Sequence, residues 1–166
     1  TQGVEMATID DHAFRDNCGK LKMLSSFSQG NPHLEFVYDF DHPSLAQLNE
    51  EYALSELRGK DELECALNVL RWVNTNVYHD GSKDLKTTDS LSILAYAYKN
   101  GPDGGVTCFH QSIVLCECLL SLRIHARILH LLPLNPYDFD SHVVVIAYIP
   151  SLAKWVMLDP TYNCYC

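Results

Sequence analysis

Three side chains in the second half of the chain have the types needed for thiol chemistry: Cys108, His142 and Asp159. Cys108 stands where the glycine-rich stretch GPDGGVT gives way to an apolar run, which predicts that it opens a helix. The positive end of a helix dipole favours a thiolate, and the unpaired N–H groups of a first turn suit a developing oxyanion. We therefore interpret Cys108 as a nucleophile to which Gly104 and Gly105 give access.

His142 and Asp159 are expected to meet through a hairpin. The segments HVVVIAYIP and KWVMLDP have the β-branched and aromatic content of strands, and the turn between them falls near residues 150–153. Pairing around that turn puts His142 opposite Asp159 or one diagonal step away. Because the strand period is two, both registers place the two side chains on one face. An aspartate that accepts an imidazole N–H fixes the tautomer and stabilises the imidazolium.

The elements that must position these side chains are helices followed by strands. Asp61 and Glu64 form a capping-box pattern, and Gly101 is a helix stop. The predicted helices are 41–54, 61–78, 89–101 and a largely buried one from Cys108, on which His110 falls on a narrow, solvated polar stripe. The predicted strands are 125–133, 142–150 and 154–160, which are apolar on both faces and therefore covered on both sides. This order predicts an α+β fold, with helices packed on an antiparallel β-sheet.

The first part of the chain has no sustained period. We interpret residues 1–43 as an irregular N-terminal arm, in which LEFVYDF (34–40) forms one strand, and residues 44–166 as the domain that carries the chemistry. No apolar run approaches the roughly 18 residues of a membrane span, and no signal peptide is visible, so we expect neither.

Composition and charge limit the classes of partner that the chain can bind. A formal net charge of −9, with 12 Lys and Arg residues, argues against nucleic acid and against an anionic membrane, because both need a basic patch. Seven cysteines without a C-x2-C pair predict neither a complete disulfide framework nor a zinc ribbon, and most are interpreted as buried thiols. We expect no metal and no cofactor, and His125 and His130 are interpreted as structural. The oligomeric state stays open.

The stretches GGVTCFHQSIVLCECLLSLRIHARIL and DSHVVVIAYIPSLAKWVMLDPTYN together resemble the transglutaminase-like superfamily, including its bacterial-type cysteine protease members. In that family a Cys opens a central helix, a His heads one strand, and an Asp closes the next strand, often as Asp-Pro. The resemblance covers roughly residues 45–163. It implies a papain-like core in which Cys108, His142 and Asp159 form a catalytic triad.

The resemblance leaves the second oxyanion donor open. Animal transglutaminases carry a Trp shortly before the catalytic helix, whereas the corresponding place here falls near Thr87 and Thr88. Trp72 is interpreted as a packing residue of its own helix. Asp138 and Asp140 lie in the loop before His142, and their charge favours a basic or amine-bearing substrate. The candidate oxyanion or cleft residues are Gly105, Thr107, Gln111, Thr87 and Tyr137.

The function that this resemblance implies is a thiol-dependent amide-bond enzyme, either a cysteine protease or amidase, or an acyltransferase to an amine or water. Its substrate would be a peptide, a protein or a small amide, attacked by the Cys108 thiolate to give an acyl-enzyme. Two alternatives stay open. One is an arylamine N-acetyltransferase-like enzyme, although Asp103 stands where that family has an Arg. The other is an inactive transglutaminase-like binding module.

Overall fold

The structure, a computed structural model, describes residues 36–133, 137 and 141–166, and within it Tyr38–Cys166 forms one unit. Helices precede strands in this unit, so the α+β prediction is confirmed. The α-helices are α2 (Pro43–Glu51), α3 (Glu62–Asn76), α4 (Ser90–Asn100) and α5 (Cys108–Ser121), with 3₁₀ turns at Leu54–Leu57, Gly101–Asp103 and Pro150–Leu152. Each α-helix overlaps a helix that the sequence predicts.

Side-chain caps fix where two of the helices begin. Asp61 accepts a hydrogen bond from the Glu64 N–H at 2.8 Å and opens α3. The Glu64 carboxylate in turn accepts from the N–H of Lys60 at 2.7 Å, one residue before the position that an ideal capping box uses. Asp89 opens α4 in the same way by accepting from the Ser92 N–H at 2.8 Å. These caps satisfy N–H groups that have no partner inside their helix.

The sheet is antiparallel in the order β1-β2-β3-β4. Its strands are β1 (Ala126–Leu131), β2 (His142–Ile149), β3 (Lys154–Asp159) and β4 (Cys164–Tyr165). The first three strands were predicted, whereas β4 was not, because two residues are too few to show a period. The 3₁₀ turn Pro150–Leu152 and Ala153, with φ at 49°, join β2 to β3 where the hairpin turn was expected.

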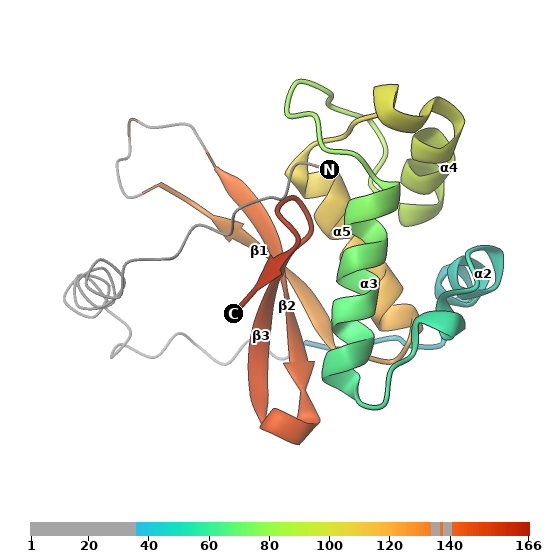
Figure 1. The fold of residues 1–166 in the computed structure, drawn as a ribbon, viewed down its shortest axis with the longest axis vertical. Helices are drawn as coiled ribbons and strands as arrows, with labels where there is room; N and C mark the ends of the chain where they lie inside the picture. The colour runs from blue at the N-terminus through green and yellow to red at the C-terminus, as the bar shows by residue number, and fades with distance from the viewer. Residues whose placement is uncertain (1–35, 134–136, 138–140) are drawn as a thin grey trace, which may run out of the picture. The chain divides into compact units, whose positions relative to one another are not determined.

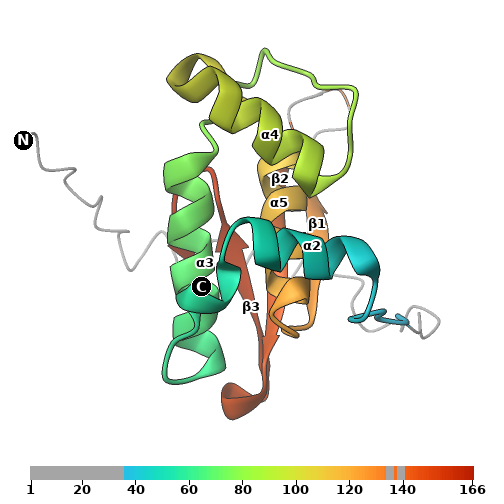
Figure 2. The same cartoon turned by 90° about the vertical axis from the view of Figure 1, so that its right-hand side faces the viewer.

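The helices lie on one face of the sheet (Figure 1), with α5 against β1 and β2 and α3 against β2 and β3. α2 and α4 pack on the outer side of α5 (Figure 2). In the part of the chain that the structure describes, helices contact this face only, so the expected cover on both faces is observed for one. On the other face the Arg127 guanidinium lies 4.1 Å from the centre of the Trp155 ring, beside Tyr148.

The prediction of a strand at residues 34–40 is wrong for those of its residues that the structure describes. Residues 36–40 have no strand, and Tyr38 and Phe40 instead pack their rings against His125. Residues 34 and 35, like most of the predicted N-terminal arm, lie outside the described residues. Of the described helices, none has the combined length and apolar character required to cross a bilayer.

Candidate active site

Cys108 is the first residue of α5, where the sequence predicts it. Thr107 occupies the capping position, but its hydroxyl lies 2.7 Å from Nδ1 of His110, and among the described residues it makes no side-chain cap to α5. This favours chemistry at Cys108, because the N–H groups of the first turn lie at the positive end of the helix dipole and can donate to a ligand.

His110 is buried, which corrects the prediction of a solvated stripe. Its side chain is 1% exposed, and Nε2 lies 3.2 Å from the carbonyl oxygen of Leu85. The segment between α3 and α4 thus covers this side of α5 and supplies the polar partners that water was expected to supply. With both ring nitrogens engaged, by Thr107 and Leu85, His110 fixes the start of α5.

The backbone before Cys108 is held by a parallel bridge between His79 and Val106. The Asp80 N–H donates to the carbonyl of Val106, and the Val106 N–H donates to the carbonyl of Tyr78, both at 2.8 Å. Gly105 permits this approach, because a Cβ there would lie 2.5 Å from the Cβ of Asp80. Gly105 therefore fits two backbone segments together and is buried between them.

His142 and Asp159 form the contact that the hairpin predicts. The register pairs Val145 with Leu158, which sets His142 one diagonal step from Asp159. Nε2 of His142 lies 2.7 Å from Oδ2 of Asp159, whose side chain is buried. The other oxygen, Oδ1, accepts from the N–H of Thr161 at 2.9 Å.

This arrangement selects a tautomer of His142. An ionised Asp159 can only accept, so the hydrogen of the imidazole lies on Nε2 when the ring is neutral. Nδ1 then carries the lone pair and is the nitrogen able to remove a proton. The rigid hydrogen bonds to Oδ1 hold the carboxylate so that it orients the ring.

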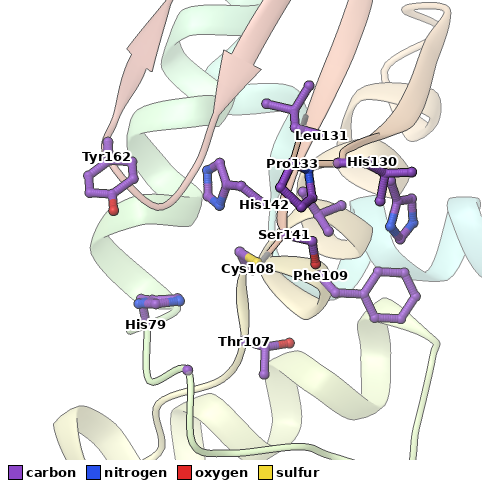
Figure 3. Close-up of a pocket in the computed structure, with 13 residues that line it drawn as sticks. His79, Thr107, Cys108, Phe109, His130, Leu131, Pro133, Ser141, His142 and Tyr162 are labelled. Atoms are coloured by element: carbon purple, nitrogen blue, oxygen red, sulfur yellow. The ribbon is translucent and has the colours of Figure 1, made fainter. Parts of the chain in front are cut away.

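Cys108 and His142 line the same surface cavity, which has a volume of about 750 Å³. Figure 3 shows them in its middle, with His79 and Tyr162 to one side and Phe109 and His130 to the other. The hydrogen bonds of the described residues do not include one between the Cys108 sulfur and His142. Catalytic hydrogen bonds of this kind are often long until substrate binds.

The remaining predicted oxyanion or cleft residues lie in different settings. Gln111 is 1% exposed, and its amide donates to the carbonyl of Val77 at 2.6 Å and accepts from the Thr161 hydroxyl at 2.8 Å. The Thr87 hydroxyl donates to Asp89. Thr107 lines the cavity, and Tyr137 is exposed. Asp138 and Asp140 lie outside the described residues.

Of the other described thiols, Cys164 and Cys166 are exposed, and the three buried ones differ sharply from Cys108 in their surroundings. Burial raises the pKa of Cys116 to about 12, and burial also raises the pKa of Cys118 and that of Cys65. Cys108 is only partly buried and opens to the cavity. Among the described residues no group of three His, Cys, Asp or Glu side chains is placed to hold a metal.

His79 and Tyr162 are among the cavity residues that the sequence reasoning missed. The Tyr162 ring centre lies 5.6 Å from that of His142. The signal for Tyr162 was its place three residues after Asp159 in DPTY. For His79 there was none, because HDG follows a helix and is typical of a helix end.

His130 also lines the cavity, whereas it was interpreted as structural. Trp72 packs against Tyr52, as expected for a packing residue.

Comparison with known protein families gives one match. The family described as "Transglutaminase-like superfamily" matches residues 52–160, which include Cys108, His142 and Asp159. No curated protein and no solved structure matches the chain.

Proposed function

The chain belongs to the transglutaminase-like superfamily, whose members are generally Cys-His-Asp thiol enzymes, and on that premise we propose that it hydrolyses an amide bond. Cys108 is the nucleophile, His142 the general base and acid, and Asp159 the residue that orients His142. The observation that carries the proposal is the 2.7 Å contact between His142 Nε2 and Asp159 Oδ2, beside a cavity that Cys108 shares.

The proposed reaction has two halves. Nδ1 of His142 takes the proton of the Cys108 thiol, and the sulfur attacks the carbonyl carbon of the substrate amide. The resulting imidazolium is stabilised by Asp159 and protonates the departing amine, which leaves a thioester on Cys108. In the second half His142 takes a proton from water, and the hydroxide attacks the thioester carbon. Collapse of this second tetrahedral intermediate frees the acid and returns the thiol.

The oxyanion needs two donors, and we assign them to the start of α5 and to His79. The Cys108 N–H is at the first position of α5, where helix N–H groups lack partners within the helix. His79 lines the same cavity and is anchored through its bridge to Val106, two residues before Cys108. A ring N–H of His79 supplies the second hydrogen bond to the oxyanion.

Released amine tests the proposal directly. Wild type would be screened against a library of blocked peptide and simple amides, and we expect release of amine with at least one of them. Cys108→Ala should abolish release, because no thioester forms without the sulfur. With a slow substrate the intact mass of the wild type should rise by the mass of the acyl group, and that gain should be absent in Cys108→Ala.

Matched controls separate chemistry from folding. His142→Ala should lose release, whereas His125→Ala should retain it, because His125 lies outside the cavity and packs against Tyr38 and Phe40. Acyl transfer to an amine is measured in the same assay by adding glycine amide and determining the mass of the product by mass spectrometry. An inactive binding module predicts no release and no mass gain with any amide, which would overturn the proposal.

A further inference from the structure

The cavity has an apolar wall on one side of Cys108 and His142. It consists of Phe109, Leu131, Leu132 and Pro133, and we call it the apolar wall. Figure 3 shows Phe109, Leu131 and Pro133 on the opposite side of the cavity from His79 and Tyr162. The apolar wall is assembled from two elements, the first turn of α5 and the end of β1 with the residues that follow it.

This wall starts at the reacting residues themselves. Phe109 follows Cys108 directly in α5, and Leu131 is the β1 residue that pairs with His142 in the sheet register. The wall is therefore within reach of a side chain next to a carbonyl carbon that meets the Cys108 sulfur. The wall is thus close enough to the chemistry to discriminate between substrates.

Two residues of the wall are exposed, although apolar side chains of this size are normally buried, and Phe109 and Pro133 are half-buried. Leu132 is 77% exposed and Leu131 is 38% exposed. Large apolar side chains gathered at a cavity mouth are typical of binding sites, because a ligand that covers them removes apolar surface from water. An ammonium or carboxylate placed against the four side chains of the apolar wall would lose its water and find no charged partner among them, and an ammonium would gain nothing from the neighbouring His130.

We propose that the apolar wall binds an uncharged aliphatic or aromatic side chain next to the scissile amide, so that the substrate class is a peptide or amide with an apolar residue at that position. The proposal names the substrate of the proposed hydrolase and rests on that function for the cleavage step only. The expectation of a basic or amine-bearing substrate, drawn from Asp138 and Asp140, is the competing outcome of the test below.

Binding to the uncleavable variant Cys108→Ala tests the wall apart from catalysis. The probes are acetylated tripeptide amides that differ only at the middle residue, which is leucine, phenylalanine, lysine or glutamate, and titration calorimetry gives their affinities. The leucine and phenylalanine peptides should bind at least about 10-fold more tightly than the lysine and glutamate peptides, the scale of discrimination that an apolar pocket supplies.

Leu132→Asp in the Cys108→Ala background should abolish that preference and improve the relative binding of the lysine peptide. Leu152→Asp is the matched control, since Leu152 is also exposed, at 47%, but lies in the turn at the other end of β2. It should leave all affinities unchanged. Because both leucines are exposed, both variants should fold, which circular dichroism would check.

Equal affinities for all four peptides, tighter binding of a charged peptide, or no binding of any peptide would overturn the apolar wall as a substrate site. Failure of the proposed function gives a different result. In that case Cys108→Ala would still prefer the apolar peptides, while wild type would cleave none of them. Where wild type does cleave, its kcat/KM values should follow the same order as the affinities.

Discussion

At the scale of single residues, the chemistry depends on which nitrogen of His142 faces the cavity. Asp159 uses Oδ2 for the imidazole and Oδ1 for the N–H groups of Thr161 and Tyr162. A carboxylate held at both oxygens cannot turn, so it keeps the proton of the neutral ring on Nε2. In the proposed mechanism Nδ1 is then the base, and Asp159 acts through His142.

Asp159→Asn tests this assignment. The asparagine carbonyl can still accept from Thr161, while its NH₂ group donates to Nε2 and forces the hydrogen of the ring onto Nδ1. We expect kcat to fall by roughly 10³- to 10⁴-fold, as the wrong tautomer does in other triads, with little change in stability. Asp84→Asn is the control, because Asp84 is an exposed carboxylate outside the cavity. An unchanged kcat in Asp159→Asn would contradict the role of Asp159.

His79 has a separable prediction. If it donates to the oxyanion, His79→Ala should lower kcat by about 100-fold with little change in KM, because the hydrogen bond is made mainly in the transition state. His79→Gln offers an amide N–H and should recover part of that loss. Tyr78→Phe is the neighbouring control. A rise in KM at constant kcat would instead indicate that His79 only binds the ground state.

At the scale of elements, one side chain connects three parts of the site. Gln111 in α5 donates to Val77 at the end of α3 and accepts from Thr161 beside Asp159. It therefore ties the helix that carries Cys108 to the strand end that orients His142. A buried amide with both of its ends bonded is costly to remove, because its partners lose their hydrogen bonds away from water.

We expect Gln111→Ala to lower the free energy of unfolding by about 2–4 kcal/mol, because it leaves the buried Val77 carbonyl and the part-buried Thr161 hydroxyl without this partner and opens a cavity. Urea unfolding followed by circular dichroism measures it. Gln47→Ala is the matched control in α2, where Gln47 is exposed, and should change stability by less than about 0.5 kcal/mol. Equal effects of the two substitutions would show that the Gln111 bonds contribute nothing.

The sequence predicted the elements that have strong local signals. The capping pattern of Asp61 and Glu64 marks a helix start, and the strand period places His142 and Asp159 on one face in either register. His110 was predicted wrongly because the residues that bury it come from another segment. His79 reaches the site through its bridge to Val106, a long-range backbone pairing that no local pattern encodes.

At the scale of the whole molecule, the buried thiols are expected to make the free energy of unfolding depend on pH in the alkaline range. Burial raises the pKa of Cys116 to about 12, and it also raises the pKa of Cys118. Above the ordinary thiol pKa of about 8.5 the unfolded chain loses these protons while the folded chain keeps them. The folded state then binds more protons, so stability must fall as pH rises from there.

The free energy of unfolding should therefore decline between pH 9 and 11, with a contribution that approaches about 1.4 kcal/mol per pH unit for each of the two thiols. Urea titrations at several pH values measure the slope. In Cys116→Ala/Cys118→Ala the slope should become shallower, whereas Cys166→Ala should leave it unchanged, since Cys166 is exposed. A slope that the double substitution does not alter would contradict the role of burial.

The most direct test of the proposed triad is the rate at which iodoacetamide alkylates each cysteine at mildly acidic pH, with the adducts mapped by peptide mass. We predict that Cys108 reacts faster than the exposed Cys166 and the buried Cys65, and that His142→Ala removes this advantage, because the imidazole that takes the proton of the thiol is what makes the Cys108 sulfur nucleophilic. If Cys108 reacts no faster than these thiols, or keeps its rate in His142→Ala, Cys108 and His142 do not form a catalytic pair.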